Sequence, residues 1–225
     1  MQLRADRVSL EGHHGTLLPA TSLTVGEAEL AIVHGEPGVG VTAFGLALAG
    51  RLKPSTGTVH AEGTDAKPSE LVAVVDAPGV SEPDEALQLR VVVGEELALA
   101  HRPASKTDVA NWLAEHDAAA FATTRFENLE PALRTRLLTE LAAGREGVRV
   151  LVLDTPDRHT SLVWTWATLA RELADRGFAV VVLTATTPEQ ALPFAPARIG
   201  STEQPAPETH AKTEALAAST EEDNA

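Results

Sequence analysis

The chain has 225 residues, 44% of them hydrophobic, which is enough for one α/β domain with a sizeable buried core. A formal net charge of −14 excludes nucleic acid as the main ligand, because duplex binding depends on neutralising phosphates with Lys and Arg. The sequence contains no cysteine, which excludes disulfides, thiolate metal sites and cysteine nucleophiles and fits a reducing compartment.

The N-terminal section, residues 2–25, has short alternating runs at 3–8 and 22–25, which predict antiparallel strands. It shows no apolar export signal, and no run in the sequence approaches the about 18 apolar residues that a membrane-spanning helix needs. We therefore expect a cytoplasmic protein.

Four apolar runs of strand length predict strands of a mainly parallel sheet, because strands buried on both faces read as continuous Val, Ile and Leu blocks. These runs are residues 29–34, 71–75, 148–153 and 178–183. The segments between them predict helices at 42–52, 91–100, 106–118, 131–143 and 162–176. The stretch from about 85 to 143 is mainly helical, which predicts a small helical subdomain in an α/β fold.

The C-terminal segment is rich in Pro, Ala, Thr and Glu and poor in bulky apolar residues. From Ser201 onward it contains six acidic residues and one base, Lys212. We expect residues 198–225 to be a disordered acidic tail.

The segment GEPGVGVT, residues 35–42, follows a predicted strand and opens a predicted helix. It matches the phosphate-loop spacing G-x-x-x-x-G-K-[ST] at Gly35, Gly40 and Thr42, with Val41 at the lysine position. Glycines such as Gly38 let backbone N–H groups turn toward phosphate oxygens at a helix N-terminus, while the lysine neutralises phosphate charge. The sequence therefore keeps the phosphate cradle and lacks its cation.

The next run, LALAGRLKPSTGTV at residues 46–59, resembles the run that follows the phosphate loop in ATP-binding cassette (ABC) proteins. The resemblance extends over residues 3–196. It implies an ABC-type domain at 1–197, with a P-loop NTPase core of mainly parallel strands, N-terminal antiparallel strands and the helical subdomain at about 85–143.

Following the family order, Asp76 stands at the glutamine of the Q-loop, and residues 129–133 fill the signature-loop slot with only Leu129 matching. Asp154 stands at the magnesium-associated aspartate that ends the Walker B strand. Thr155 replaces the glutamate that polarises water, and Ala185 replaces the switch histidine. His14 stands near the position of the adenine-stacking aromatic residue.

The resemblance implies a vestigial nucleotide site and no catalytic residue, because groups that neutralise phosphate charge and orient water are all replaced. The site residues would be Gly35, Gly38, Gly40, Val41, Thr42, Ala43, Asp76, Asp154 and Thr155. No cofactor is required and no metal is bound by the protein alone; ATP and Mg²⁺ would bind weakly, with Thr42 and Asp154 nearest the metal. A plainer alternative is that Thr42 caps a helix and Asp154 caps a strand end.

Three functions are compatible with this pattern. The first is a catalytically degenerate scaffold or regulatory subunit, docked on an integral membrane protein through the helical subdomain and peripheral at the inner face of the plasma membrane. The second is an ATP-binding subunit that contributes a degenerate site beside an active ABC-type partner, as half of a dimer. The third is a soluble interaction module with no nucleotide role, whose acidic tail recruits partners.

Other patterns give weaker predictions. The sequence D-A-P-G at residues 76–79 matches a GTPase switch, but no N-K-x-D segment follows it. Glu11, His13 and His14 lack the spacing of a metal site. Residues 157–161 contain Asp, His and Ser without the context of a hydrolase nucleophile.

Trp164 and Trp166 lie two residues apart near the start of a predicted helix. Residues with this spacing face different sides of a helix. We therefore predict that one of them lies in the core and that the other is available to a partner.

Overall fold

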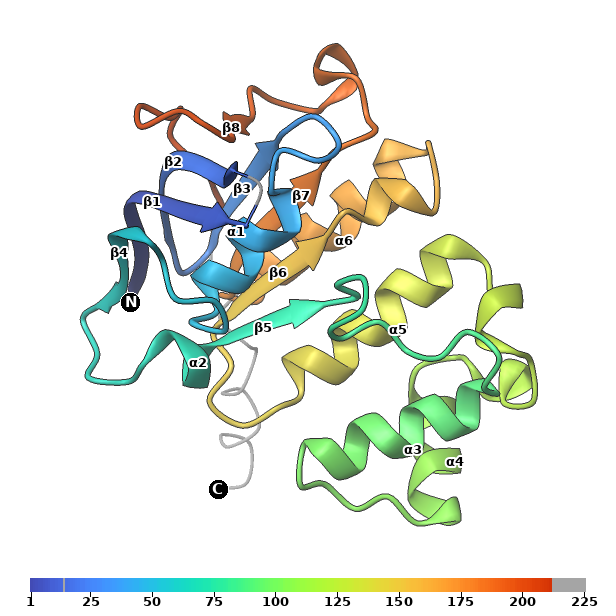
Figure 1. Ribbon diagram of the computed structural model, residues 1–225. Helices are drawn as coiled ribbons and strands as arrows, with labels where there is room; N and C mark the ends of the chain where they lie inside the picture. The colour runs from blue at the N-terminus through green and yellow to red at the C-terminus, as the bar shows by residue number, and fades with distance from the viewer. Residues whose placement is uncertain (14, 212–225) are drawn as a thin grey trace, which may run out of the picture.

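The computed structural model describes residues 1–13 and 15–211 (Figure 1). His14 and residues 212–225 of the predicted tail lie outside the described residues. The described chain folds into an α/β structure with a mainly parallel sheet and a separate antiparallel sheet, which confirms the predicted fold class.

The central sheet has six strands in the order β5-β6-β7-β3-β8, with β9 also pairing with β3. The strands from β5 to β8 in this order run parallel to their neighbours. Their bounds are β3 Glu29–His34, β5 Val72–Val75, β6 Val150–Asp154, β7 Ala179–Thr184, β8 Ala197–Arg198 and β9 Glu208–Thr209. The four predicted apolar runs form β3, β5, β6 and β7.

Both faces of this sheet are buried, which explains why its strands read as unbroken apolar runs. On β3, Leu30 and Ile32 belong to one hydrophobic cluster, whereas Ala31 and Val33 belong to a second cluster on the opposite face. Helix α1 (Val41–Leu48) packs into the second cluster together with the antiparallel sheet. Helices α5 (Pro131–Ala143) and α6 (Val163–Asp175) pack into the first.

The antiparallel sheet has the order β2-β1-β4, formed by β1 Gln2–Gly12, β2 Gly15–Gly26 and β4 Thr56–Glu62. The first two strands were predicted. Strand β4 was not, because every one of its residues is exposed or half-buried and its sequence has no apolar block.

Helices α3 (Leu89–Leu99) and α4 (Lys106–Glu115) lie together, away from α1 and the antiparallel sheet (Figure 1). Helix α4 begins with a capping box, in which the Ser105 hydroxyl accepts from the Asp108 amide at 3.3 Å. Helix α5 lies between this pair and strands β5 and β6, so it connects the helical segment to the sheet. None of the described helices has the length and apolarity to span a bilayer.

The shorter elements complete the chain. They are α2 Pro68–Leu71 and the 3-10 helices η1 Ala119–Phe121, η2 Phe126–Asn128, η3 Pro156–Arg158 and η4 Glu189–Ala191. The two tryptophans of the predicted pair have opposite environments, since Trp166 is 1% exposed and Trp164 is 67% exposed.

The C-terminal segment differs from its prediction. Strand β8 pairs with the end of β3, and β9 pairs antiparallel with its beginning, where Thr209 is opposite Glu29. The Arg171 Nε donates to Glu208 Oε1 at 3.1 Å, and His210 Nδ1 lies 3.0 Å from Asp175 Oδ1. The prediction of disorder is therefore wrong for residues 198–211, because backbone pairing and ion pairs fix a segment whose composition is that of a linker.

Candidate functional site

The phosphate-loop segment lies between β3 and α1, where the sequence predicted it. Gly38 and Gly40 both have φ of +90°, a left-handed conformation that glycine adopts readily. A Cβ atom added at Gly40 would lie 2.2 Å from the Leu17 carbonyl oxygen of β2. A glycine is therefore required at position 40 for two reasons: the left-handed backbone conformation and the close approach of β2.

Val41 points into the protein core. Its side chain is 6% exposed and belongs to the hydrophobic cluster shared by α1 and the antiparallel sheet. A Cβ added at Gly35 would lie within 2.9 Å of Val41, Val39 and Ile199 side-chain atoms. The position that the resemblance assigns to a lysine is thus filled by packed aliphatic carbon.

The backbone of the loop keeps donors that could meet an anion. Helix α1 begins at Val41, so the N–H groups of Val41, Thr42 and Ala43 have no intrahelical acceptor. The N-cap is Gly40 without a side-chain cap bond, so Thr42 does not cap the helix. Amides at a helix N-terminus favour anions, and here they act without a lysine.

Asp154, at the end of β6, is joined to this loop. Its Oδ1 accepts hydrogen bonds from the hydroxyls of Thr42 and Thr155, each at 3.1 Å. The side chain is buried, and its Oδ2 has no partner among the described residues. Burial raises the pKa of Asp154 above its usual range, and the two hydroxyl bonds offset this only in part. An unpaired buried carboxylate oxygen costs stability and is the kind of atom that a cation would satisfy.

Asp76 lies in a neighbouring cluster rather than in the loop site. It follows β5 with φ of +58° and is buried. Arg134 of α5 contacts it with two bonds, from Nε to Oδ2 at 3.0 Å and from Nη2 to Oδ1 at 2.9 Å. His159 Nε2 lies 3.1 Å from the Asp76 Oδ2, and Arg158 Nη2 lies 3.2 Å from Oδ1.

Charge pairing decides the ionisation of Asp76. Burial alone would raise its pKa, but the bonds from His159 and Arg134 and the charges of Arg134 and Arg158 outweigh burial and lower the pKa. Asp76 is therefore a carboxylate at neutral pH, in contact with two guanidinium groups.

Arg158 connects the two groups of residues. Its Nη1 donates to the backbone carbonyls of Asp76 at 2.6 Å and of Asp154 at 3.1 Å. The guanidinium therefore lies across the carboxyl ends of β5 and β6. The loop residues 35–43, Asp154 and Thr155 form one site, and Arg158 contacts both Asp154 and Asp76.

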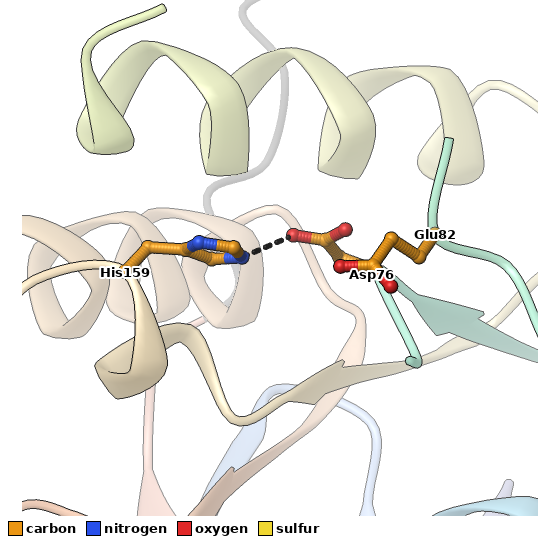
Figure 2. Close-up of side chains that lie close together, drawn as sticks. All are labelled: Asp76, Glu82 and His159. Carbon is orange, nitrogen blue, oxygen red and sulfur yellow. Dashed lines mark hydrogen bonds and ion pairs between the residues drawn. The ribbon is translucent and has the colours of Figure 1, made fainter. Parts of the chain in front are cut away.

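Asp76, Glu82 and His159 have the ligand atoms of a potential metal site, within 4.8 Å of one another. Figure 2 shows the His159 ring directed at the Asp76 carboxylate, with Glu82 on the opposite side. However, Arg134 already donates two hydrogen bonds to the Asp76 carboxylate, and Arg158 Nη2 lies 3.2 Å from Asp76 Oδ1 and 2.9 Å from Glu82 Oε1. A divalent cation would have to displace the buried guanidinium of Arg134 and the half-buried one of Arg158, so this cluster fits an internal ion-pair network and not a metal site.

Asp157 holds the segment that follows β7. Its Oδ2 accepts from the backbone N–H groups of Ala185, Thr186 and Thr187 at 3.0, 2.7 and 2.8 Å. Ala185 stands at the switch-histidine position of the resemblance, and a buried carboxylate fixes the backbone at that position.

The sequence reasoning missed Arg134, Arg158 and the role of Asp157. A signal was present, because the charged triplet Asp-Arg-His at 157–159 follows a fully buried strand almost directly. Charges in this position must be paired or exposed. The partner Arg134 could not be predicted, because the sequence of α5 has an ordinary amphipathic pattern that does not indicate a buried arginine.

Comparison with known proteins gives matches to solved structures only. No protein-family model and no curated protein matches the sequence. The structure resembles that of a putative ABC transporter ATP-binding protein from Pyrococcus furiosus, with a TM-score of 0.61 at 15% identity over 88% of this chain and 96% of that one.

Two further structures are similar. One is an ATP-binding subunit of an ABC transporter, with a TM-score of 0.58 at 15% identity over 83% of this chain and 80% of that one. The other is a nucleotide-free ATP-binding cassette from an ABC transporter, with a TM-score of 0.58 at 16% identity over 83% of this chain and 82% of that one. At these identities the likeness is one of fold, and this chain has the fold of an ATP-binding cassette.

Proposed function

We propose that this cassette-fold protein does not hydrolyse ATP and acts as a scaffold or regulatory subunit, docked on a membrane protein or transporter complex. The observation that carries the proposal is the burial of Val41 among Val39 and Ile199. Replacing the phosphate-neutralising cation with packed aliphatic carbon removes a charge-assisted contact to the nucleotide. It also makes the loop part of the hydrophobic core.

The surroundings of Asp154 support the same conclusion. Thr155 occupies the position of the water-polarising glutamate, and its hydroxyl donates to Asp154 Oδ1. A hydroxyl is not basic enough to take a proton from water near neutral pH. With Ala185 at the switch position, neither residue supplies a general base.

Nucleotide binding without turnover is supported in part by the geometry. The amides of Val41, Thr42 and Ala43 would face phosphate oxygens, and Thr42 with the unpaired Asp154 Oδ2 would lie nearest the metal. A bound Mg²⁺ would neutralise phosphate charge in place of the absent lysine. Asp154 Oδ2 has no partner among residues 1–13 and 15–211, which favours a second candidate function, an ATP-binding subunit that contributes a degenerate site beside an active ABC-type partner.

The helical segment offers a surface for the partner. A groove of about 790 Å³ lies between α3 and α4. Its lining is mostly apolar and includes Val91, Gly94, Ala98 and Ala110, with exposed Arg90, Glu95 and Lys106 beside them. Small residues along one groove let the backbone of a helix approach closely, so a helical segment of a membrane partner fits this surface.

The enzymatic part of the proposal is tested by calorimetric titration with ATP and Mg²⁺ together with phosphate release on the same sample. The proposal expects no phosphate release above the buffer blank. Binding without release supports the second candidate, and no binding at millimolar ATP supports the scaffold alone. Turnover by the wild-type chain would overturn the proposal.

The docking part is tested with paired variants of the exposed face of α4. Ala110→Arg fills the groove, whereas Asn111→Arg adds the same side chain at an exposed residue that does not line it. Cross-linking in membranes, followed by identification of the captured protein, should lose one membrane protein in Ala110→Arg and retain it in Asn111→Arg. Equal capture by both variants would contradict docking at this groove.

A further inference from the structure

Element η3 lies at the edge of the central sheet that is formed by the carboxyl ends of its parallel strands. It follows β6 almost directly, and β6 lies between β5 and β7. The carboxyl ends of all three strands therefore meet at η3. We call the three residues Asp157, Arg158 and His159 the η3 anchor.

The anchor holds the segment after β7 through Asp157. One carboxylate oxygen accepts three consecutive backbone N–H groups, and the Asp157 carbonyl accepts from the Thr186 hydroxyl at 3.0 Å. Bonds from backbone amides to a carboxylate are about twice as strong as bonds between neutral groups. The hydrogen bonds to Asp157 thus fix the conformation of residues 184–187.

The anchor holds the segment after β5 through the next two residues. Arg158 bonds the Asp76 carbonyl with Nη1 and Glu82 with Nη2, and His159 lies beside the Asp76 carboxylate. Both terminal nitrogens of the Arg158 guanidinium therefore have acceptors within the protein. Arg158 is thus a fixed internal cation and not one free to meet a phosphate.

The same carboxylate extends the network to the helical segment. Arg134 of α5 is 4% exposed and contacts Asp76 with two bonds, and its Nη1 lies 3.3 Å from Glu85 Oε1. The anchor is thereby linked through one buried carboxylate to the start of α5. A continuous set of buried and half-buried charges runs from residues 184–187, across η3, to α5.

We propose that the η3 anchor holds residues 76–85, residues 184–187 and the start of α5 in one conformation regardless of nucleotide. The charges that hold these segments are permanent parts of the chain, so no ligand is needed to order them. The start of α5 is consequently held in place at all times. This inference goes beyond the proposed function, because it holds whether or not ATP binds.

Hydrogen–deuterium exchange of the full chain tests the proposal, with and without millimolar ATP and Mg²⁺. In the wild type, exchange of residues 76–85, 131–136 and 184–187 should be the same in both conditions. Arg158→Gln should raise exchange in 76–85 and at the start of α5 by about tenfold or more, since each charged bond lost is worth about that factor. Asp157→Ala should raise exchange in 184–187.

Arg158→Lys is the conservative variant, because it keeps the charge but cannot bridge a carbonyl and a carboxylate with a planar fork. Its exchange in 76–85 should be raised as well, although less than in Arg158→Gln. Protection of β6 and β7 reports whether each variant is folded. If Arg158→Gln unfolds, the comparison of Arg158→Lys with the wild type decides the question.

Two results would overturn the proposal. One is a change of exchange in these segments when the wild type is given ATP. The other is unchanged exchange in 76–85 in both folded Arg158 variants. Phosphate release by the wild type would contradict the proposed function and leave the anchor standing, so the two failures are distinguishable.

Discussion

Arg134 and Asp76 form a two-bond ion pair in which both side chains are almost fully buried, at 4% and 7% exposed. The pair joins α5 to the end of β5, two elements far apart in the sequence. Buried pairs of this kind are costly to break from one side, because the remaining charge loses its partner in a medium that solvates it poorly.

We expect Asp76→Asn to lower the free energy of unfolding by about 3 kcal/mol, since it removes the buried carboxylate that Arg134 and Arg158 share and leaves them only the more exposed Glu82 and Glu85. Arg134→Met should also destabilise the protein, and the double variant should lose less than the sum of the two. Urea denaturation measures all three. As a control, Arg4→Met breaks an ion pair with Glu62 whose side chains are 51% and 47% exposed and should change stability little. Additive effects would show that the pair is not coupled.

The stabilising effect of Asp76 should depend on pH with a defined sign. Its folded pKa is lowered, so its contribution is complete above the unfolded value of about 3.9 and is lost as pH falls through the folded pKa. The difference in unfolding free energy between wild type and Asp76→Asn should therefore be largest near neutral pH and should shrink below about pH 4. Denaturation at a series of pH values measures it, and a constant difference would contradict this account.

Asp154→Asn is expected to leave stability unchanged or raise it at pH 7. Burial raises the folded pKa of Asp154, so its ionised form opposes folding as pH rises through that pKa. A gain of 1 kcal/mol would raise Tm by about 2–4 °C in a chain of this size. Calorimetry on the variant measures it, with Asp157→Asn as control: that carboxylate accepts three amides, and its loss should lower Tm. A clear loss of stability in Asp154→Asn would mean that the carboxylate is paired in solution.

Val41→Lys should restore the missing cation of the loop. We expect tighter ATP binding by about tenfold or more, because one charged hydrogen bond contributes at least that factor. Stability should fall, since Val41 is packed against Val39. Calorimetric titration measures the affinity, and Val41→Met serves as the control of similar length without charge. Equal affinities in both variants would show that the loop cannot present a lysine to phosphate.

The tryptophan pair on α6 gives a prediction with an internal control. Trp166→Ala should cost about 3–5 kcal/mol because its ring is fully buried. Trp164→Ala should change stability by less than about 0.5 kcal/mol because its ring is exposed. Chemical denaturation compares them directly. A large effect of Trp164→Ala would contradict the exposure of its ring.

Much of the fold could be predicted from local pattern. The apolar run at 29–34 forms β3 with the same bounds, and the helix predicted at 131–143 is α5. These elements are buried on one or both faces, so the buried positions are apolar and can be recognised in the sequence. Strand β4 escaped prediction because its pairing with β1 is made by backbone groups, which leave no apolar signature.

For the candidate site, the sequence predicted which residues lie near one another better than it predicted their contacts. The loop, Asp154 and Thr155 do meet, because the carboxyl ends of parallel strands lie at one edge of the sheet. Asp76 was placed beside them from its position in the resemblance, but its contacts with Arg134 and His159 depend on residues 58 and 83 positions away. No local pattern contains a contact of that range, and only the folded chain brings these charges together.

The C-terminal strands also change how the sheet can meet other molecules. Without β8 and β9, the outer side of β3 would present a row of unpaired backbone groups, which is a template for pairing with another chain. The segment with the composition of a linker thus covers the edge of the sheet, because it pairs with β3 at both ends of that strand. Truncating the chain before residue 208 would expose part of that edge. The truncated molecules would then associate with one another through their sheet edges.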